Sequence, residues 1–195
     1  MRPLAHLCAA ALIALPPLSA PAAEPPADPE KQTPWGLYLT AREAAEMKAA
    51  QGDAVLFVDV RDPIEIMFTG FADALDVNVP FLLSNPAKWN DKKQVFAMEP
   101  NPDFAKAVEA ALHARGLDKS APVVLMCRSG GERGAPSARA LAPLGFAQVH
   151  VVVDGFEGGS SKAEPGNPAR NVEGWKNSGL PWSYRLDREK IWFPH

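Results

Sequence analysis

The sequence has 195 residues, with 20 lysine and arginine side chains against 23 aspartate and glutamate side chains, a formal net charge of −3. This slightly acidic balance gives no support for nucleic-acid binding, which requires a basic surface. His113, His150 and His195 are scattered and form no metal-ligand spacing, so we predict no metal site and no cofactor.

The first 23 residues have the pattern of a secretion signal. Arg2 supplies positive charge, Leu7 to Leu15 is an apolar run too short to span a bilayer, and Ala20-Pro21-Ala22 offers a cleavage site. The alternative is a short membrane anchor, which the prolines in this region disfavour because they break the run. We therefore expect export to a periplasm and no stable membrane insertion after cleavage.

Export affects both the number of cysteines in the mature protein and their expected role. Removal of the signal takes away Cys8 and leaves Cys127 as the one remaining cysteine. Structural cysteines of exported proteins usually occur in pairs, so a lone thiol is a candidate for reactivity or for an intermolecular partner.

Residues 24–34 are rich in proline and polar side chains, and we expect a disordered spacer there. Residues 35–195 then form one domain with a carboxyl-terminal tail, because about 160 residues suit a single core. In the tail, Trp175, Trp182 and Trp192 are predicted to pack over the core, with a partner-docking surface as the alternative.

The first half of the domain alternates helical and strand patterns. Thr40 to Glu43 is a capping box that opens a helix of about ten residues, closed near Gly52. Val55 to Val58 is predicted as a buried strand, Ile64 to Phe68 as a short helical or irregular segment, and Ala74 to Val79 as another strand.

The second half continues the alternation after a long connection. Phe81 to Pro102 is polar and is predicted as an irregular surface loop, with a functional lid as the alternative. A helix follows from Phe104 to about Arg115, then a strand at Val123 to Met126, a second helix, and a strand at Gln148 to Val153. Uniformly apolar strands alternating with helices predict an α/β fold with an open parallel sheet and helices on both faces.

The residues that suggest a reactive site follow the predicted strand Val123 to Met126. Cys127 is followed by the loop Arg128, Ser129, Gly130, Gly131, Glu132 and Arg133, and then by an alanine-rich helical pattern. Backbone N–H groups converge where such a loop enters a helix, and the helix dipole favours negative charge there. With two arginines beside it, Cys127 is expected to be partly thiolate. The alternative is a buried cysteine that merely ends a strand.

Open parallel sheets form their sites beyond the carboxyl ends of the strands. Asp59 and Arg61 leave one strand, Cys127 leaves another, and Asp154 to Gly159 follow a third, so these loops are expected to converge. We predict that Asp59 and Arg61 form a supporting ion pair beneath the loop, with substrate contact as the alternative.

Several of these segments together resemble the rhodanese-like family. Asp59-Val60-Arg61 with Glu65, Gly70 and Val79-Pro80 is similar to the family's first signature, and CRSGGER at 127–133 resembles its active loop. Val153 to Gly158 resembles the closing loop, and Gly174-Trp175 with Gly179-Leu180-Pro181 fits the usual ending, so the likeness covers Trp35 to Pro181. The resemblance implies a parallel sheet of five strands flanked by helices.

The resemblance also implies a reaction. Cys127 would be the nucleophile that carries a persulfide, while the loop amides and Arg128 would hold the sulfur and a small anionic donor such as thiosulfate. The sulfur would then pass to cyanide, a thiol or a protein acceptor. The anion cradle around a thiolate, predicted above from the loop residues alone, is compatible with this chemistry.

Two features depart from the family pattern. The family's glycine-histidine pair is here Gly70-Phe71, and Arg133 lies six positions after Cys127 rather than five. The C-x5-R spacing is the one that rhodanese-like phosphatases and arsenate reductases use, and a longer loop makes a wider cradle. Because export favours sulfur chemistry and no clear general acid is present beyond Glu132 or Asp62, we predict a sulfurtransferase. A C-x5-R phosphatase or arsenate reductase and a non-catalytic persulfide carrier or interaction module are the alternatives.

Overall fold

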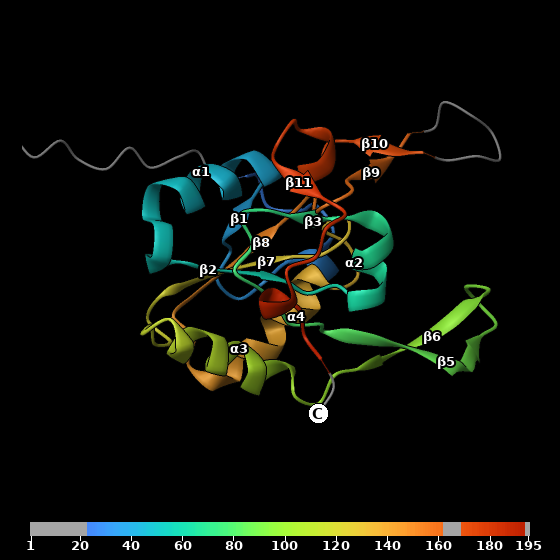
Figure 1. Cartoon of the computed structure of the whole chain (residues 1–195), viewed down its shortest axis with the longest axis horizontal. Helices are drawn as coiled ribbons and strands as arrows, with labels where there is room; N and C mark the ends of the chain where they lie inside the picture. The colour runs from blue at the N-terminus through green and yellow to red at the C-terminus, as the bar shows by residue number, and fades with distance from the viewer. Residues whose placement is uncertain (1–22, 162–168, 194–195) are drawn as a thin grey trace, which may run out of the picture.

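The computed structural model describes residues 23–161 and 169–193. Its centre is a parallel sheet of five strands in the order β1-β8-β7-β2-β4. The bounds are Tyr38–Leu39 for β1, Gln148–Val152 for β8, Pro122–Met126 for β7, Leu56–Asp59 for β2 and Val77–Asn78 for β4. The expected open α/β sheet is therefore confirmed, and β7, which leads to Cys127, occupies its middle (Figure 1).

Four α-helices cover the two faces of this sheet: α1 (Ala41–Gln51), α2 (Pro63–Thr69), α3 (Phe104–Ala114) and α4 (Gly134–Leu141). Successive side chains of a strand point to opposite faces. Val123 and Leu125 of β7 thus join a core with α3 and α4, whereas Val124 and Met126 join a core with α1, α2 and the buried Trp175. The uniformly apolar strands follow from burial on both sides.

Local sequence signals explain where the first two helices begin. Thr40 Oγ1 accepts a hydrogen bond from the Glu43 N–H at 3.2 Å, and the Glu43 carboxylate accepts one from the Thr40 N–H at 2.7 Å, so the predicted capping box is present. Asp62 caps α2, with Pro63 in the first turn.

The remaining elements are short and surround the sheet. They comprise the antiparallel pairs β3 (Phe71–Ala72) with β11 (Trp182–Ser183) and β9 (Gly159–Ser160) with β10 (Arg170–Val172), and 3-10 turns at Pro29–Lys31, Gly52–Ala54, Ala142–Leu144, Trp175–Asn177 and Arg188–Lys190. No helix in the described ranges is long and apolar enough to cross a bilayer.

The structure differs from the sequence prediction at the long connection 81–102. This segment is a β-hairpin, β5 (Leu82–Asn90) and β6 (Val95–Pro100), rather than an irregular loop. Most of its side chains are exposed, so neither strand has the apolar alternation that marks a buried face. Its turn also lacks glycine, and Gln94 adopts the left-handed conformation with φ 54°.

Two further segments differ from their predictions. The strand expected over Ala74 to Val79 is reduced to β4, and the spacer expected to be disordered is in contact with the domain. Arg139 of α4 donates to the carbonyl oxygens of Glu30 and Gln32 at 2.9 and 2.8 Å. Composition favours disorder in this segment, but these tertiary contacts offset the cost of ordering it. The predicted signal, residues 1–23, lies outside the described residues except for Ala23.

Burial of His150 in β8 is expected to make the stability of the protein depend on pH. Its Nε2 atom is buried without a hydrogen-bond partner among the described residues, and burial lowers the pKa of the imidazole. Below the ordinary histidine value of about 6.5 the unfolded chain therefore binds a proton more readily than the folded chain, and stability falls as pH falls.

We expect the free energy of unfolding to decrease from about pH 7.5 to about pH 5.5, and to decrease less in His150→Gln. Urea unfolding at the two pH values measures the difference, with His113→Gln, at an exposed position, as the control. Equal losses in wild type and His150→Gln would show that His150 is not the responsible group.

Candidate active site

Cys127 lies at the carboxyl end of β7, in the middle of the sheet. Its side chain belongs to the core on the α3 and α4 face, and only 2% of the residue is exposed. Gly134 begins α4 beside it: a β-carbon there would be 3.7 Å from Cys127 Sγ and 2.8 Å from a methyl group of Val151. A glycine at this position lets the amino end of α4 approach the thiol closely.

The loop after Cys127 is held by close packing against the loop after β8. The Phe156 and Glu157 N–H groups donate to the carbonyl oxygens of Cys127 and Arg128, both at 2.8 Å. Gly130 has φ +64°, and a β-carbon on it would be 1.6 Å from the Val153 carbonyl oxygen. Glycine is thus required at position 130 by left-handed backbone and by lack of space.

The backbone N–H groups of the loop are available for an anion. Within the described part of the chain, none of the N–H groups from Arg128 to Arg133 donates to a backbone carbonyl. The first turn of α4, where the helix dipole favours negative charge, begins beside the thiol at Gly134. This arrangement can stabilise a thiolate, a persulfide anion or an anionic substrate.

Both arginines of the loop are paired with acids. Arg128 Nε lies 2.6 Å from Glu157 Oε2, and Arg133 donates to both carboxylate oxygens of Glu65 in α2, at 2.5 and 2.9 Å. The sequence predicts both arginines as substrate contacts, and in the structure each guanidinium also anchors the loop to a neighbouring element.

Charge stabilises Arg133 in this position. Burial by itself lowers the pKa of Arg133, but the hydrogen bonds and charge of Glu65, with contributions from Cys127 and Asp59, raise it above its ordinary value. The guanidinium therefore stays charged in its position between the loop and α2.

Asp59 and Arg61 form the predicted ion pair, and it is completely buried. Arg61 Nε lies 2.9 and 3.0 Å from the two Asp59 oxygens, and the guanidinium also donates to Thr69 Oγ1 and the Gly70 carbonyl oxygen. It stacks on the Phe156 ring at 4.1 Å, which links this pair to the loop that packs on Cys127. The pair is a support beneath the site.

The structure also contains site residues that the sequence interpretation did not single out. Glu65 and Glu157 hold the two arginines, and Lys93 from the hairpin turn lies 2.6 Å from the exposed Glu132 of the loop. Glu65 and Glu157 fall within recognised family segments and could have been considered as partners. Lys93 has no such signal, because only the fold brings it to a loop residue 39 positions away.

Comparison with known proteins identifies the family of this chain. A family model described as the rhodanese-like domain matches residues 40–162. The chain belongs to the rhodanese-like domain family. No curated protein matches the rhodanese-like chain. Among solved structures, Rv0390 from M. tuberculosis is 27% identical and covers 76% of this chain and 97% of its own length, with a TM-score of 0.55.

Two other solved structures are more distant from this rhodanese-like domain. BH2092 from Bacillus halodurans is 19% identical over 60% of this chain and 66% of its own, with a TM-score of 0.38. A protein from Rhodopseudomonas palustris described as a possible tyrosine phosphatase is 24% identical over 60% and 74%, with a TM-score of 0.34. The match to the family model confirms the predicted family, the five-stranded parallel sheet confirms the predicted fold, and the reaction is a separate question.

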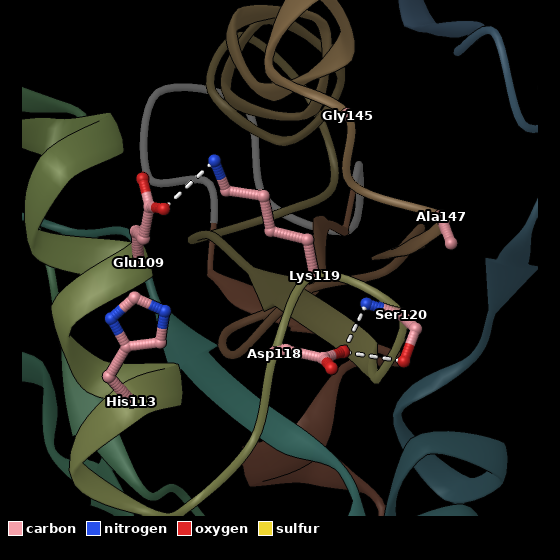
Figure 2. A pocket seen from close by; sticks show the side chains of 7 residues that line it. All are labelled: Glu109, His113, Asp118, Lys119, Ser120, Gly145 and Ala147. Carbon is pink, nitrogen blue, oxygen red and sulfur yellow. Dashed lines mark hydrogen bonds and ion pairs between the residues drawn. The ribbon is translucent and has the colours of Figure 1, made fainter.

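A pocket of the rhodanese-like domain lies away from the thiol, with a volume of about 380 Å³ (Figure 2). Its lining includes Ser120 and Ala147, just before β7 and β8, so it lies at the end of the sheet opposite to Cys127. Glu109 and Lys119 pair there at 2.9 Å, and hydrogen bonds from Ser120 lower the pKa of Asp118. Glu109 and Lys119 neutralise each other, Asp118 accepts hydrogen bonds from Ser120, and the pocket is not part of the thiol site.

Proposed function

We propose that this rhodanese-like protein is a sulfurtransferase that moves a sulfane sulfur from thiosulfate, or a related anionic donor, through a persulfide on Cys127. The observation that carries the proposal is the position of Cys127 at the end of β7, under a loop whose N–H groups donate to no backbone carbonyl within the described residues. Such a cradle suits the anionic species of this reaction.

The reaction has two steps. The Cys127 thiolate attacks the outer sulfur of thiosulfate, the S–S bond of the donor breaks, and sulfite leaves with the bonding electron pair. The terminal sulfur of the resulting persulfide carries negative charge, which the loop N–H groups and the dipole of α4 stabilise. An acceptor nucleophile, such as cyanide or a thiol, then takes this sulfur and releases the thiolate.

The charged residues around the site have separate structural roles in this proposal. Glu157 and Glu65 hold Arg128 and Arg133 at the two ends of the loop, so that the loop keeps its position after the thiol. Asp59 and Arg61 support the closing loop from below through Phe156. The amino-terminal pattern supports export, so the proposed donor and the thiol or protein acceptor are periplasmic.

A thiocyanate assay tests the proposal. The full chain is expected to form thiocyanate from thiosulfate and cyanide, and Cys127→Ser is expected to lower the rate by about a thousandfold or more because the nucleophile is lost. Circular dichroism of the serine variant is the control for folding. A folded wild-type protein without turnover, or a serine variant that keeps it, would contradict sulfur transfer.

One observation favours a second function. Six positions separate Cys127 from Arg133, the C-x5-R spacing of rhodanese-like phosphatases and arsenate reductases. Hydrolysis of an aryl phosphate, or reduction of arsenate, that depends on Cys127 in the absence of thiocyanate formation would support that function. A Cys127 peptide heavier by one sulfur atom, without turnover, would instead indicate a persulfide carrier.

A further inference from the structure

The β5–β6 hairpin is an arm that starts beside the site and extends away from the sheet (Figure 1). Its base is fixed to α2, because Ser84 donates from its N–H and its hydroxyl to the Asp62 carboxylate at 2.8 and 2.7 Å. Further out, the rings of Trp89 and Phe96 pack edge to face with centroids 5.7 Å apart. The arm therefore has its own internal support, although most of its side chains are exposed.

The turn of this arm reaches the active loop. Asn90 caps the turn, accepting from the N–H of Lys93 at 3.0 Å through its side chain and from the N–H of Gln94 at 2.8 Å through its carbonyl. Lys93 Nζ then lies 2.7 and 2.6 Å from the two carboxylate oxygens of Glu132. The hairpin thus delivers one ammonium group to the loop that covers Cys127.

Three cations meet acids around this loop, and they differ in burial. Arg133 and Glu65 have side chains only 12% and 19% exposed, and Arg128, which is 42% exposed, pairs with a Glu157 side chain that is only 12% exposed. In the third pair, Lys93 is 51% and Glu132 75% exposed. An exposed ion pair has little net stability, whereas separating a buried one leaves an uncompensated charge. Lys93 is therefore the cation that can exchange its acid for an incoming anion most easily.

We propose that Lys93 is a specificity-determining residue that binds the anionic end of the sulfur donor, and that Glu132 occupies its ammonium group until the donor arrives. For the donor's identity this rests on the proposed function. Thiosulfate would turn its outer sulfur inward to Cys127 and its three oxygens outward to Lys93. The leaving sulfite would remain in contact with the same ammonium group, while the sulfur step itself is unchanged.

This role predicts opposite effects for the two partners of one ion pair. Removal of Lys93 takes away the contact with the donor, whereas neutralisation of Glu132 removes a competitor for that contact. A pair that only held the loop in place would respond in the same direction to both changes. The adjacent Lys92, which is also exposed, is the matched control.

Thiosulfate kinetics of the full chain give the first test. Lys93→Ala is expected to raise KM for thiosulfate about fivefold with little change in kcat, the size of one exposed charge contact. Glu132→Gln is expected to lower KM, and Lys92→Ala to leave it unchanged. If wild type turns over and Lys93→Ala has the wild-type KM, or both partner variants shift KM in the same direction, the role of Lys93 is wrong.

Alkylation of Cys127 gives a second test that needs no turnover. Iodoacetate and iodoacetamide react with the same thiol but differ by one negative charge, and the rates are read by mass spectrometry on the Cys127 peptide. Lys93→Ala should lower the iodoacetate-to-iodoacetamide rate ratio, Glu132→Gln should raise it, and Lys92→Ala should leave it unchanged. A ratio insensitive to Lys93 would overturn the proposal, whether or not the protein forms thiocyanate.

Discussion

Gly130→Ala is expected to lower the proposed sulfur-transfer activity strongly and to destabilise the protein. The added β-carbon would lie 1.6 Å from the Val153 carbonyl oxygen, and alanine at φ +64° is strained even where space is available. The loop would have to shift away from the Val153 carbonyl, and its position relative to Cys127 would change. We expect a loss of activity of at least about a hundredfold and of stability of about 2–4 kcal/mol.

Gly131→Ala is the matched control for this prediction. A β-carbon on Gly131 would meet only Ser129 Oγ at 3.6 Å, an ordinary contact. Thiocyanate assays and urea unfolding of both variants measure the two effects separately. Wild-type activity in Gly130→Ala, or equal losses in the two variants, would show that the loop does not depend on this close approach.

Arg61→Met is expected to cost about 3–5 kcal/mol of stability, because Asp59 would keep its charge in the core without a partner. The pair is completely buried, and Arg61 also holds Thr69, Gly70 and the face of Phe156. The free energy of unfolding in urea measures the loss. Activity should fall as well, since Phe156 donates to the Cys127 carbonyl.

Two further variants test whether the unpaired charge of Asp59 causes this loss of stability. Adding Asp59→Asn to Arg61→Met removes the uncompensated charge and should recover part of the stability. Lys88→Met breaks an exposed pair with Glu99, in which the side chains are 63% and 41% exposed, and should change stability by less than about 1 kcal/mol. If the double variant is no more stable than Arg61→Met, lost contacts of Arg61 and not the charge of Asp59 account for the effect.

Sequence signals with a local cause were reliable for this protein. The Thr40 capping box depends on atoms three residues apart, and the strand before Cys127 is a short apolar run because both faces of the sheet are covered. Elements that are defined by long-range pairing were not predicted. The strand Tyr38–Leu39 has two residues and is defined by its pairing with β8, and the β5–β6 hairpin has no apolar face to generate a period.

The sequence by itself determined the parallel α/β fold, the family, and a thiol followed by a glycine-containing loop, because each depends on residue types within a short stretch. The tertiary structure decided which acid neutralises which cation around that loop. Glu65 meets Arg133 from 68 positions away, Glu157 meets Arg128 from 29, and Lys93 meets Glu132 from 39. Many acids in this chain could pair with a given arginine, and only the packing of α2, the hairpin and the closing loop around β7 selects among them.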